Sequence, residues 1–312
     1  MAPAFRFGAA LSYQLTGDSA AEAVRAESLG YDVVVLGDHI GPELSPMVAL
    51  AAAAQHTERI RLATLVINAD LRSPTQLAWD AVTLDHLSGG RFELGVGAGH
   101  TPQEHGAVGV PRRPATVRKQ RLMELVEIVR RLVDGETVDV TSDFFDLRGA
   151  HVGRSAQQHL PILVGGNGDR LLQHAGRHAD IVGLQGLGRT LADGHRHDVL
   201  WSAEHLDRQV EQIRIGAGDR MHQVELSALV QIVEVTDHRS AALDRICARV
   251  EGLDRAAAEV IPYLLVGSVE ELVAQLHEVR RRWGISYFSV RDNEGFAPVL
   301  TAVREAEPSS RP

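Results

Sequence analysis

The amino-acid sequence predicts a single α/β domain over residues 1–312, folded as a (β/α)₈ barrel (TIM barrel) with insertions. Short apolar runs rich in β-branched residues alternate with helical patterns almost from end to end. The runs lack the polar alternation of a half-exposed sheet, which indicates parallel strands that are buried on both faces. Eight such runs in 312 residues match the number of strands that a (β/α)₈ barrel requires.

The first half of the chain supplies four pairs of a strand and a helix. Each expected strand is a short apolar run, and each expected helix carries apolar residues three and four positions apart. The strands are expected at 5–11, 31–39, 59–67 and 91–97, and the helices at Ser19–Leu29, Pro46–His56, Thr75–Leu87 and 118–135.

The second half completes the barrel and carries two longer insertions. Strands are expected at 161–166, 180–186, 225–235 and 285–290, and helices at 169–179, Glu204–Ile215 and 269–284. The insertions are Val140–Leu160, before the fifth strand, and Thr236–Ser268, before the last helix. Insertions at one face of a barrel often shape a substrate pocket, so we expect these segments to influence specificity.

A doubly wound open sheet is the competing architecture. Its dinucleotide-binding form needs GxGxxG at the start of a helix, with an acidic residue about 20 positions later. Here the alternate glycines of the fourth strand are followed by His100 and Pro102, and a long loop is expected to delay the next helix until about Pro114. The context therefore does not fit the nucleotide fingerprint.

Charge and composition exclude several classes of function. The formal net charge of −9 argues against a general nucleic-acid binder, which needs clustered Lys and Arg. No apolar run reaches membrane-spanning length, and the N-terminus lacks the pattern of a secretory signal. The sole cysteine, Cys247, rules out an intrachain disulfide and a cysteine-rich metal site. We therefore expect a cytoplasmic protein without a nucleic-acid or membrane partner.

Polar residues and glycines follow the second to fifth expected strands. In a barrel of this kind the chemistry lies at the C-terminal ends of the strands. These four ends carry Gly37, Asp38 and His39; Asn68, Ala69 and Asp70; Gly97, Ala98, Gly99 and His100; and Gly165, Gly166, Asn167 and Gly168. We expect these residues to meet at the mouth of the barrel.

The segment GGNG, residues 165–168, lies between a strand and a helix. Glycines in that place leave backbone N–H groups free at a helix N-terminus, which is a site for an anion such as phosphate. A plain turn that needs positive φ angles explains an isolated Gly-Gly pair equally well. Within the barrel pattern we prefer the phosphate interpretation.

His39 stands where a strand end would direct an imidazole into the barrel mouth. An imidazole titrates near neutral pH, so His39 could act as a general acid or base. A surface or capping histidine is the structural alternative in a chain with 15 histidines. The sequence predicts no metal site, since an HExxH motif is absent, and no serine nucleophile, since GxSxG is absent.

Five stretches of sequence carry a family resemblance through their order along the chain. They are DHI near residue 40, RSPTQLAWDAVTLDHLSGGRFELGVGAGHTPQEHGAVGVP, the helix RLMELVEIVRRLVDG, PILVGGNGDRLLQHAGRHADIVGL, and the late VGSVEELVAQLHEVRRRWGISYFSV. In this order they resemble the bacterial luciferase-like flavin and deazaflavin oxidoreductases. The resemblance covers most of the chain and is strongest from Arg72 to Leu184.

The resemblance implies a luciferase-like (β/α)₈ barrel that binds FMN or the deazaflavin coenzyme F420 at its C-terminal mouth, without covalent attachment. Segment 97–99, which is Gly-Ala-Gly, would lie against the planar ring system of the cofactor. Segment 165–168 would hold the cofactor's phosphate.

The resemblance also implies which residues act on the ring and the substrate. An Asp-His pair of the deazaflavin branch maps onto Asp38 and His39, with His39 as proton donor or acceptor. A bulge that sometimes contains a non-prolyl cis peptide maps near Asn68, which is expected to contact the cofactor. Some sugar-phosphate dehydrogenases of the family have a glutamate where this chain has His100, so their activity is not carried over. His100 and Glu104 are the further candidates for catalysis.

The choice of cofactor follows the same resemblance. The chain length, the Asp-His pair and the stretch LSGGRFELGVGAG are closer to the deazaflavin group than to the FMN enzymes. We therefore expect an F420-dependent oxidoreductase that transfers a hydride between the coenzyme and a small organic substrate. An FMN-dependent luciferase-like monooxygenase and a non-catalytic flavin-binding barrel are the alternatives. A homodimer is left open as the oligomeric state.

Overall fold

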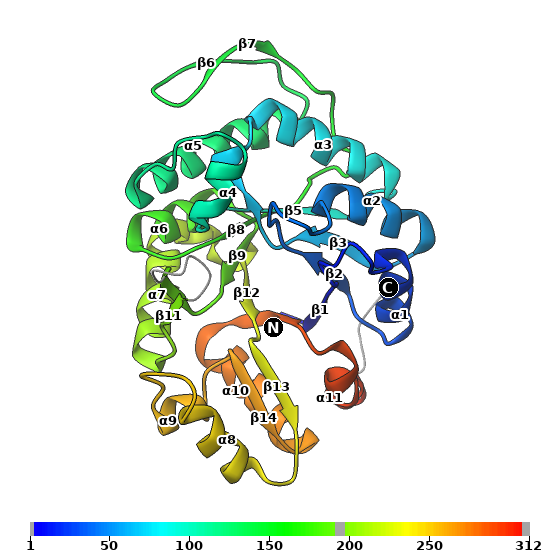
Figure 1. Cartoon of the computed structure of the whole chain (residues 1–312), viewed down its shortest axis with the longest axis vertical. Coiled ribbons are helices and arrows are strands. Elements are labelled where there is room, and N and C mark those ends of the chain that lie inside the picture. Colours follow the sequence, from blue (N-terminus) through cyan, green and yellow to red (C-terminus); the bar gives the residue numbers. More distant parts are fainter. Residues whose placement is uncertain (1–2, 191–196, 308–312) are drawn as a thin grey trace.

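The computed structural model describes residues 3–190 and 197–307 and contains a closed parallel barrel (Figure 1). The strands of its sheet are β1 (Arg6–Ala10), β2 (Val33–Leu36), β3 (Arg61–Thr64), β4 (Ile67–Asn68), β5 (Phe92–Gly97), β8 (Ile162–Gly165), β9 (Ile181–Leu184), β12 (Glu225–Leu229) and β15 (Ile285–Val290). Their order is β3-β2-β1-β15-β12-β9-β8-β5-β4, and an additional pairing of β3 with β5 closes the ring. Because β3 and β4 both pair with β5, they share one place in the ring, and the predicted (β/α)₈ barrel is confirmed.

Helices surround this ring of strands (Figure 1). They are α1 (Ser19–Ser28), α2 (Pro46–His56), α3 (Pro74–Leu87), α5 (Ala115–Val133), α6 (Asp169–His178), α7 (Ala203–Ala217), α10 (Val269–Trp283) and α11 (Asn293–Ala306). Helix α10 begins at a capping box of Ser268 and Glu271 and ends at Gly284, which adopts the left-handed conformation. No helix in the described ranges is long and apolar enough to cross a membrane.

Side chains alternate between the inside and the outside of the barrel along its strands. In β2, Val34 and Leu36 belong to the main hydrophobic core, which also contains the buried residues of the surrounding helices. Val33 and Val35 belong instead to a second cluster that includes Tyr287 of β15. The two clusters take opposite faces of the same strands, so the interior of the barrel is filled with side chains.

Ion pairs connect neighbouring parts of the barrel at the N-terminal ends of its strands. The Glu93 carboxylate, whose side chain is 2% exposed, accepts hydrogen bonds from Arg6 and Arg61. Arg6 also donates to Glu225. These four residues lie at the start of β5, β1, β3 and β12, so one ionic network joins four strands.

The structure departs from the predicted elements at several points, among them the strand expected at 59–67, which is divided into β3 and β4. The strand expected at 225–235 is broken, because β12 ends at Leu229 and β13 (Ile232–Val235) pairs with β14 (Leu264–Gly267) in a separate sheet. The expected loop after the fourth strand contains a short helix, α4 (Pro102–Ala107). The prediction also missed α11, which follows the last strand.

The two predicted insertions have secondary structure of their own. Residues 140–160 overlap a hairpin of β6 (Val138–Thr141) and β7 (Asp146–Ala150), which projects beyond the helices in Figure 1. Residues 236–268 contain α8 (Arg239–Cys247), α9 (Arg255–Ala258) and β14. A further hairpin of β10 (Leu187–Thr190) and β11 (His197–Val199) follows β9.

Candidate active site

A cavity of about 1240 Å³ lies at the C-terminal ends of the barrel strands. The predicted site residues that line it are Asp38, His39, Asn68, Gly97, Ala98, Gly99, His100, Glu104, Gly165, Gly166 and Asn167. Gly168 stands one position further on, as the N-cap of α6, and is not part of the lining. The structure thus brings the predicted strand ends together around one space, while the chemical role of each residue stays a prediction.

His39 and Glu104 form the central polar pair of the cavity. His39 follows β2, and its Nδ1 lies 2.8 Å from Oε1 of Glu104 on α4. The side chain of Glu104 is 4% exposed, whereas that of His39 is 41% exposed. The other carboxylate oxygen of Glu104 accepts a hydrogen bond of 3.1 Å from the side-chain amide of Asn68. Both carboxylate oxygens are therefore bound, and the imidazole is held at its Nδ1, while no residue in the described ranges forms a hydrogen bond with its Nε2.

The pair shifts the pKa values of both of its members. The hydrogen bond to Glu104 raises the pKa of His39 above its usual value, against the opposing effect of burial. Burial alone would raise the pKa of Glu104, but the hydrogen bonds from His39 and Asn68 outweigh it and lower that pKa. Glu104 is therefore ionised near neutral pH, and His39 titrates at a higher pH than an isolated imidazole.

Asp38 binds the backbone of Asn68, which belongs to the same site. Its carboxylate accepts two hydrogen bonds of 2.9 Å from Arg72 and one of 3.0 Å from the backbone N–H of Asn68. Burial raises the pKa of Asp38, and the charge of Arg72 opposes this shift. Because Asp38 fixes the backbone of Asn68, and Asn68 holds Glu104, Asp38 contributes to the position of the His39–Glu104 pair.

Helix α4 is the local structure that places Glu104 beside His39. It starts at Pro102, which suits the first position of a helix because proline lacks an N–H group and has a helical φ angle. His105, which follows Glu104 on this helix, is buried, and its Nε2 lies 3.0 Å from Oδ2 of Asp70. The other oxygen of Asp70 accepts a hydrogen bond of 3.1 Å from Arg113. The contact between His105 and Asp70 holds α4 beside the residues that follow β4.

Gly99 is required by the packing of the site itself. It has a φ of +69°, and a Cβ atom there would lie 2.0 Å from the side-chain oxygen of Asn68. A side chain at this position would displace Asn68 and therefore its hydrogen bond to Glu104. Contact of this glycine with a cofactor ring, as the sequence suggested, stays a prediction.

His100 lies in a different electrostatic environment from His39. Its ring centroid is 5.7 Å from that of His39 and 4.7 Å from that of His197 on β11. Burial, together with the charges of these two histidines, lowers the pKa of His100 to about 4. His100 is therefore neutral at physiological pH and is a poorer proton donor than His39.

The segment after β8 forms a sharp turn before α6. Gly166 has a φ of +156°, and a Cβ atom there would lie 2.6 Å from the buried side chain of Leu171. The N-terminus of α6 has no side-chain cap. The side chain of Asn167 bridges the turn, donating to the carbonyl of Leu187 at 2.7 Å and accepting from Lys119 at 3.2 Å.

Lys119, the only lysine in the sequence, was missed by the sequence analysis as a site residue. It lies on α5, lines the cavity and is half-buried, and burial and the neighbouring Arg118 lower its pKa. No ion pair within the described part of the chain includes Lys119, Arg118 or Arg112, all three of which line the cavity. The cavity of this acidic protein therefore has cations in its wall that lack carboxylate partners among the described residues.

A non-prolyl cis peptide joins Leu65 to Val66, between β3 and β4. Both residues line the cavity. The family resemblance placed such a bond near Asn68, and the observed bond lies slightly earlier in the chain.

Comparison with known proteins adds family membership to this geometry. Residues 3–287 match the family model of the luciferase-like monooxygenases. The chain is 35% identical over 179 residues to an F420-dependent glucose-6-phosphate dehydrogenase of Intrasporangium calvum, covering 54% of each chain. It is 39% identical over 131 residues to a 4-hydroxyprotoasukamycin monooxygenase of Streptomyces nodosus, covering 40% of this chain and 34% of the relative. The chain thus spans about half or less of these two relatives.

A solved structure supports the same fold. The coenzyme F420-dependent tetrahydromethanopterin reductase of Methanopyrus kandleri superposes with a TM-score of 0.74 at 18% identity, covering 96% of this chain and 97% of the reductase. At this identity the likeness concerns the fold alone. The match of the family model over almost the whole chain decides the assignment: this protein is a member of the luciferase-like monooxygenase family.

Proposed function

We propose that this protein is an oxidoreductase that binds the deazaflavin coenzyme F420 in the cavity and transfers a hydride between the coenzyme and a small organic substrate. The observation that carries the proposal is the hydrogen bond between His39 and Glu104, which holds a titrating imidazole in the wall of a cavity of about 1240 Å³. Small-molecule sites commonly measure about 300–1000 Å³, so this cavity has room for a cofactor together with a substrate.

Cations that have no carboxylate partner among the described residues support a phosphate at the end of the cavity beside α6. A half-buried ammonium group such as that of Lys119 is costly without an anion, and its hydrogen-bond partner in the described structure is the neutral amide of Asn167. A phosphate beside segment 165–168 would supply that anion, and the uncapped N-terminus of α6 would favour it further. Arg118 lines the cavity close by.

Apolar residues in the cavity wall fit a planar ring system. Val35, Leu65, Val66, Ile67 and Leu229 line the cavity together with segment 97–99. Such a surface excludes water and orients a ring, and a bound deazaflavin would supply a carbon atom that accepts or releases a hydride.

His39 would move the proton that accompanies the hydride. When a hydride leaves a carbon that bears a hydroxyl group, the hydroxyl proton has to pass to a base, and Nε2 of neutral His39 can accept it. In the reverse direction the protonated imidazole returns the proton to the carbonyl oxygen. Glu104 binds Nδ1 and stabilises the imidazolium, which makes it a positioning residue for either direction.

The Glu104→Gln variant tests this coupling through pH dependence. The ionised carboxylate raises the pKa of His39, so its replacement by a neutral amide should lower that pKa. The inflection assigned to His39 in the pH profile of kcat/KM should therefore move to lower pH, whichever direction of hydride transfer is measured. A profile with an unchanged inflection would show that the titrating group is not His39 paired with Glu104.

The choice between F420 and FMN is tested by measuring the binding of each cofactor to the purified protein through quenching of tryptophan fluorescence. F420 binding supports the proposal. Tight FMN binding without F420 binding would replace it with an FMN-dependent monooxygenase. The similar protein from Streptomyces nodosus is also named a monooxygenase. Cofactor binding without turnover of any substrate would favour a non-catalytic barrel.

Lys119→Gln should weaken the affinity for F420 by about 10-fold, because the variant loses one charge-assisted hydrogen bond to the phosphate. Arg281→Gln is the matched control, since Arg281 is an exposed residue of α10 paired with Glu278 on the same helix. The control should bind like the parent protein. Equal binding by Lys119→Gln would place the phosphate elsewhere.

A further inference from the structure

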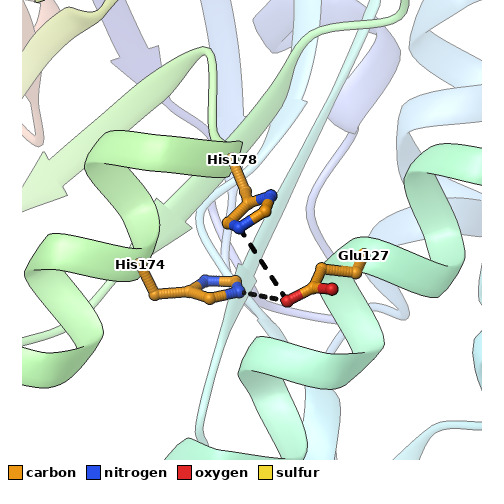
Figure 2. Close-up of side chains that lie close together, drawn as sticks. All are labelled: Glu127, His174 and His178. Atoms are coloured by element: carbon orange, nitrogen blue, oxygen red, sulfur yellow. Dashed lines mark hydrogen bonds and ion pairs between the residues drawn. The ribbon is translucent and has the colours of Figure 1, made fainter. Parts of the chain in front are cut away.

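Three side chains with metal-ligating atoms converge on the outer wall of the barrel. Glu127 comes from α5, and His174 and His178 come from the neighbouring α6 (Figure 2). One carboxylate oxygen, Oε1 of Glu127, lies 2.9 Å from Nε2 of His174 and 3.9 Å from Nε2 of His178. None of the three residues lines the cavity described above, so the cluster is separate from the candidate active site.

Helix geometry explains why these residues meet. His174 and His178 are separated by one helical turn, which puts both imidazoles on one face of α6. Figure 2 shows both rings turned toward Glu127, and their centroids are 4.4 Å apart. On α5, Glu127 lies about two turns beyond Lys119, on the stretch of the helix that runs beside α6.

The spacing of the ligand atoms suits a small transition-metal ion. One ligand atom from each of the three residues can be chosen so that all lie within 4.8 Å of one another. Zinc binds nitrogen and carboxylate oxygen at about 2.0–2.2 Å, so neighbouring ligands in a tetrahedral site lie about 3.3 Å apart. The observed separations of 2.9 and 3.9 Å lie on either side of that value, and small side-chain rotations would equalise them.

His174 is the most buried member of the cluster. This histidine is 8% exposed, and its Nδ1 is buried without a hydrogen-bond partner among the described residues. Its contact with the partly exposed carboxylate of Glu127 is therefore the one hydrogen bond that the described structure gives to a buried imidazole. A metal ion at Nε2 would take the place of this single hydrogen bond and would leave Nδ1 as it is, and the exposed side of Glu127 offers the ion a path from solvent.

We infer that Glu127, His174 and His178 bind one divalent transition-metal ion of the zinc type, which joins α5 to α6. Two imidazoles and one carboxylate leave a fourth position for water, and this ligand set suits Zn²⁺ better than the oxygen-seeking Mg²⁺ or Ca²⁺. The inference does not depend on the proposed hydride transfer, because its ligands lie outside the cavity.

Zinc binding to the full chain, with any affinity tag removed, tests the inference by isothermal titration calorimetry and thermal unfolding near neutral pH. We expect one Zn²⁺ per chain and a rise in Tm of about 3–6 °C at a zinc concentration of about 100 times Kd. His178→Gln and Glu127→Gln each remove one ligand from a partly exposed position, so both variants should fold. Each should weaken zinc binding by at least about 100-fold.

Two further variants separate this cluster from the other histidines. His222→Gln removes an exposed histidine outside the cluster, and His100→Gln removes a histidine of the cavity. Both should bind zinc like the parent protein. Absence of saturable binding, or binding that survives in His178→Gln and Glu127→Gln, would overturn the inference and leave the cluster as a hydrogen-bonded contact between two helices.

Discussion

Replacing His39 by alanine is expected to lower the rate of hydride transfer by about 10²–10⁴-fold while it changes the affinity for the coenzyme much less. A group that transfers a proton in the transition state contributes to the rate, whereas a residue that only lines a pocket contributes to affinity. The proposed first role uses Nε2, since the hydrogen bond to Glu104 occupies Nδ1. Single-turnover kinetics and coenzyme titration on the same preparation measure the two effects separately.

The stability of the His39→Ala variant has to be measured alongside its activity. The side chain of His39 is 41% exposed, so its removal should change the free energy of unfolding only modestly. A lower rate that merely follows a loss of folded protein would indicate a structural histidine. Unchanged turnover in a well-folded variant would remove His39 from the mechanism and leave His100 and Glu104 as the next candidates.

The largest loss of stability is expected at the opposite end of the barrel, where Glu93→Ala should lower the free energy of unfolding by about 3–5 kcal/mol. The Glu93 carboxylate is the buried partner of both Arg6 and Arg61, which come from two other strands. Its removal leaves two partly buried guanidinium groups without their shared counter-ion. Denaturant unfolding measures the loss. Turnover per folded molecule should be retained, because the cavity lies at the other ends of the strands.

An exposed ion pair provides the matched control for Glu93. Glu294 and Arg25 form two hydrogen bonds of 2.7 and 2.8 Å, but their side chains are 61% and 58% exposed. Exposed pairs of this kind contribute little to stability because water screens them, so Glu294→Ala should be close to neutral. Similar losses in the two variants would mean that burial of the Glu93 network adds little to stability.

Local sequence patterns predicted the barrel well and failed where tertiary contacts decide the structure. Continuous apolar runs identified the barrel strands, because a parallel strand is buried on both faces. The run 225–235 looked like one strand, yet the chain leaves the barrel at Leu229 and forms a second small sheet with residues 264–267. The hydrophobicity of residues 225–235 does not indicate that the chain leaves the barrel at Leu229. Helix α4 was missed because it is short and contains Gly106.

The candidate site was predictable to the extent that strand ends define it. Asp38, His39 and Asn68 were found because the C-terminal ends of barrel strands meet at one place. The contact between His39 and Glu104 depends on the position of helix α4, since 65 residues separate the two side chains, and no local pattern reveals it. The cluster of Glu127 with two histidines of α6 was missed for a similar reason, since 47 residues separate Glu127 from His174.

The position of Lys119 has a consequence for chemical labelling. Because the sequence contains one lysine, an amine-directed acylating reagent meets a single side-chain amine, and the remaining target is the α-amino group of the chain. The side-chain amine of Lys119 lines the cavity. Its lowered pKa increases the fraction in the nucleophilic, uncharged form at a given pH. A fluorophore attached there would report on occupancy of the cavity from a defined place, without prior removal of competing lysines. A ligand whose phosphate occupies the site would protect the amine, so the rate of acylation would itself serve as a binding assay.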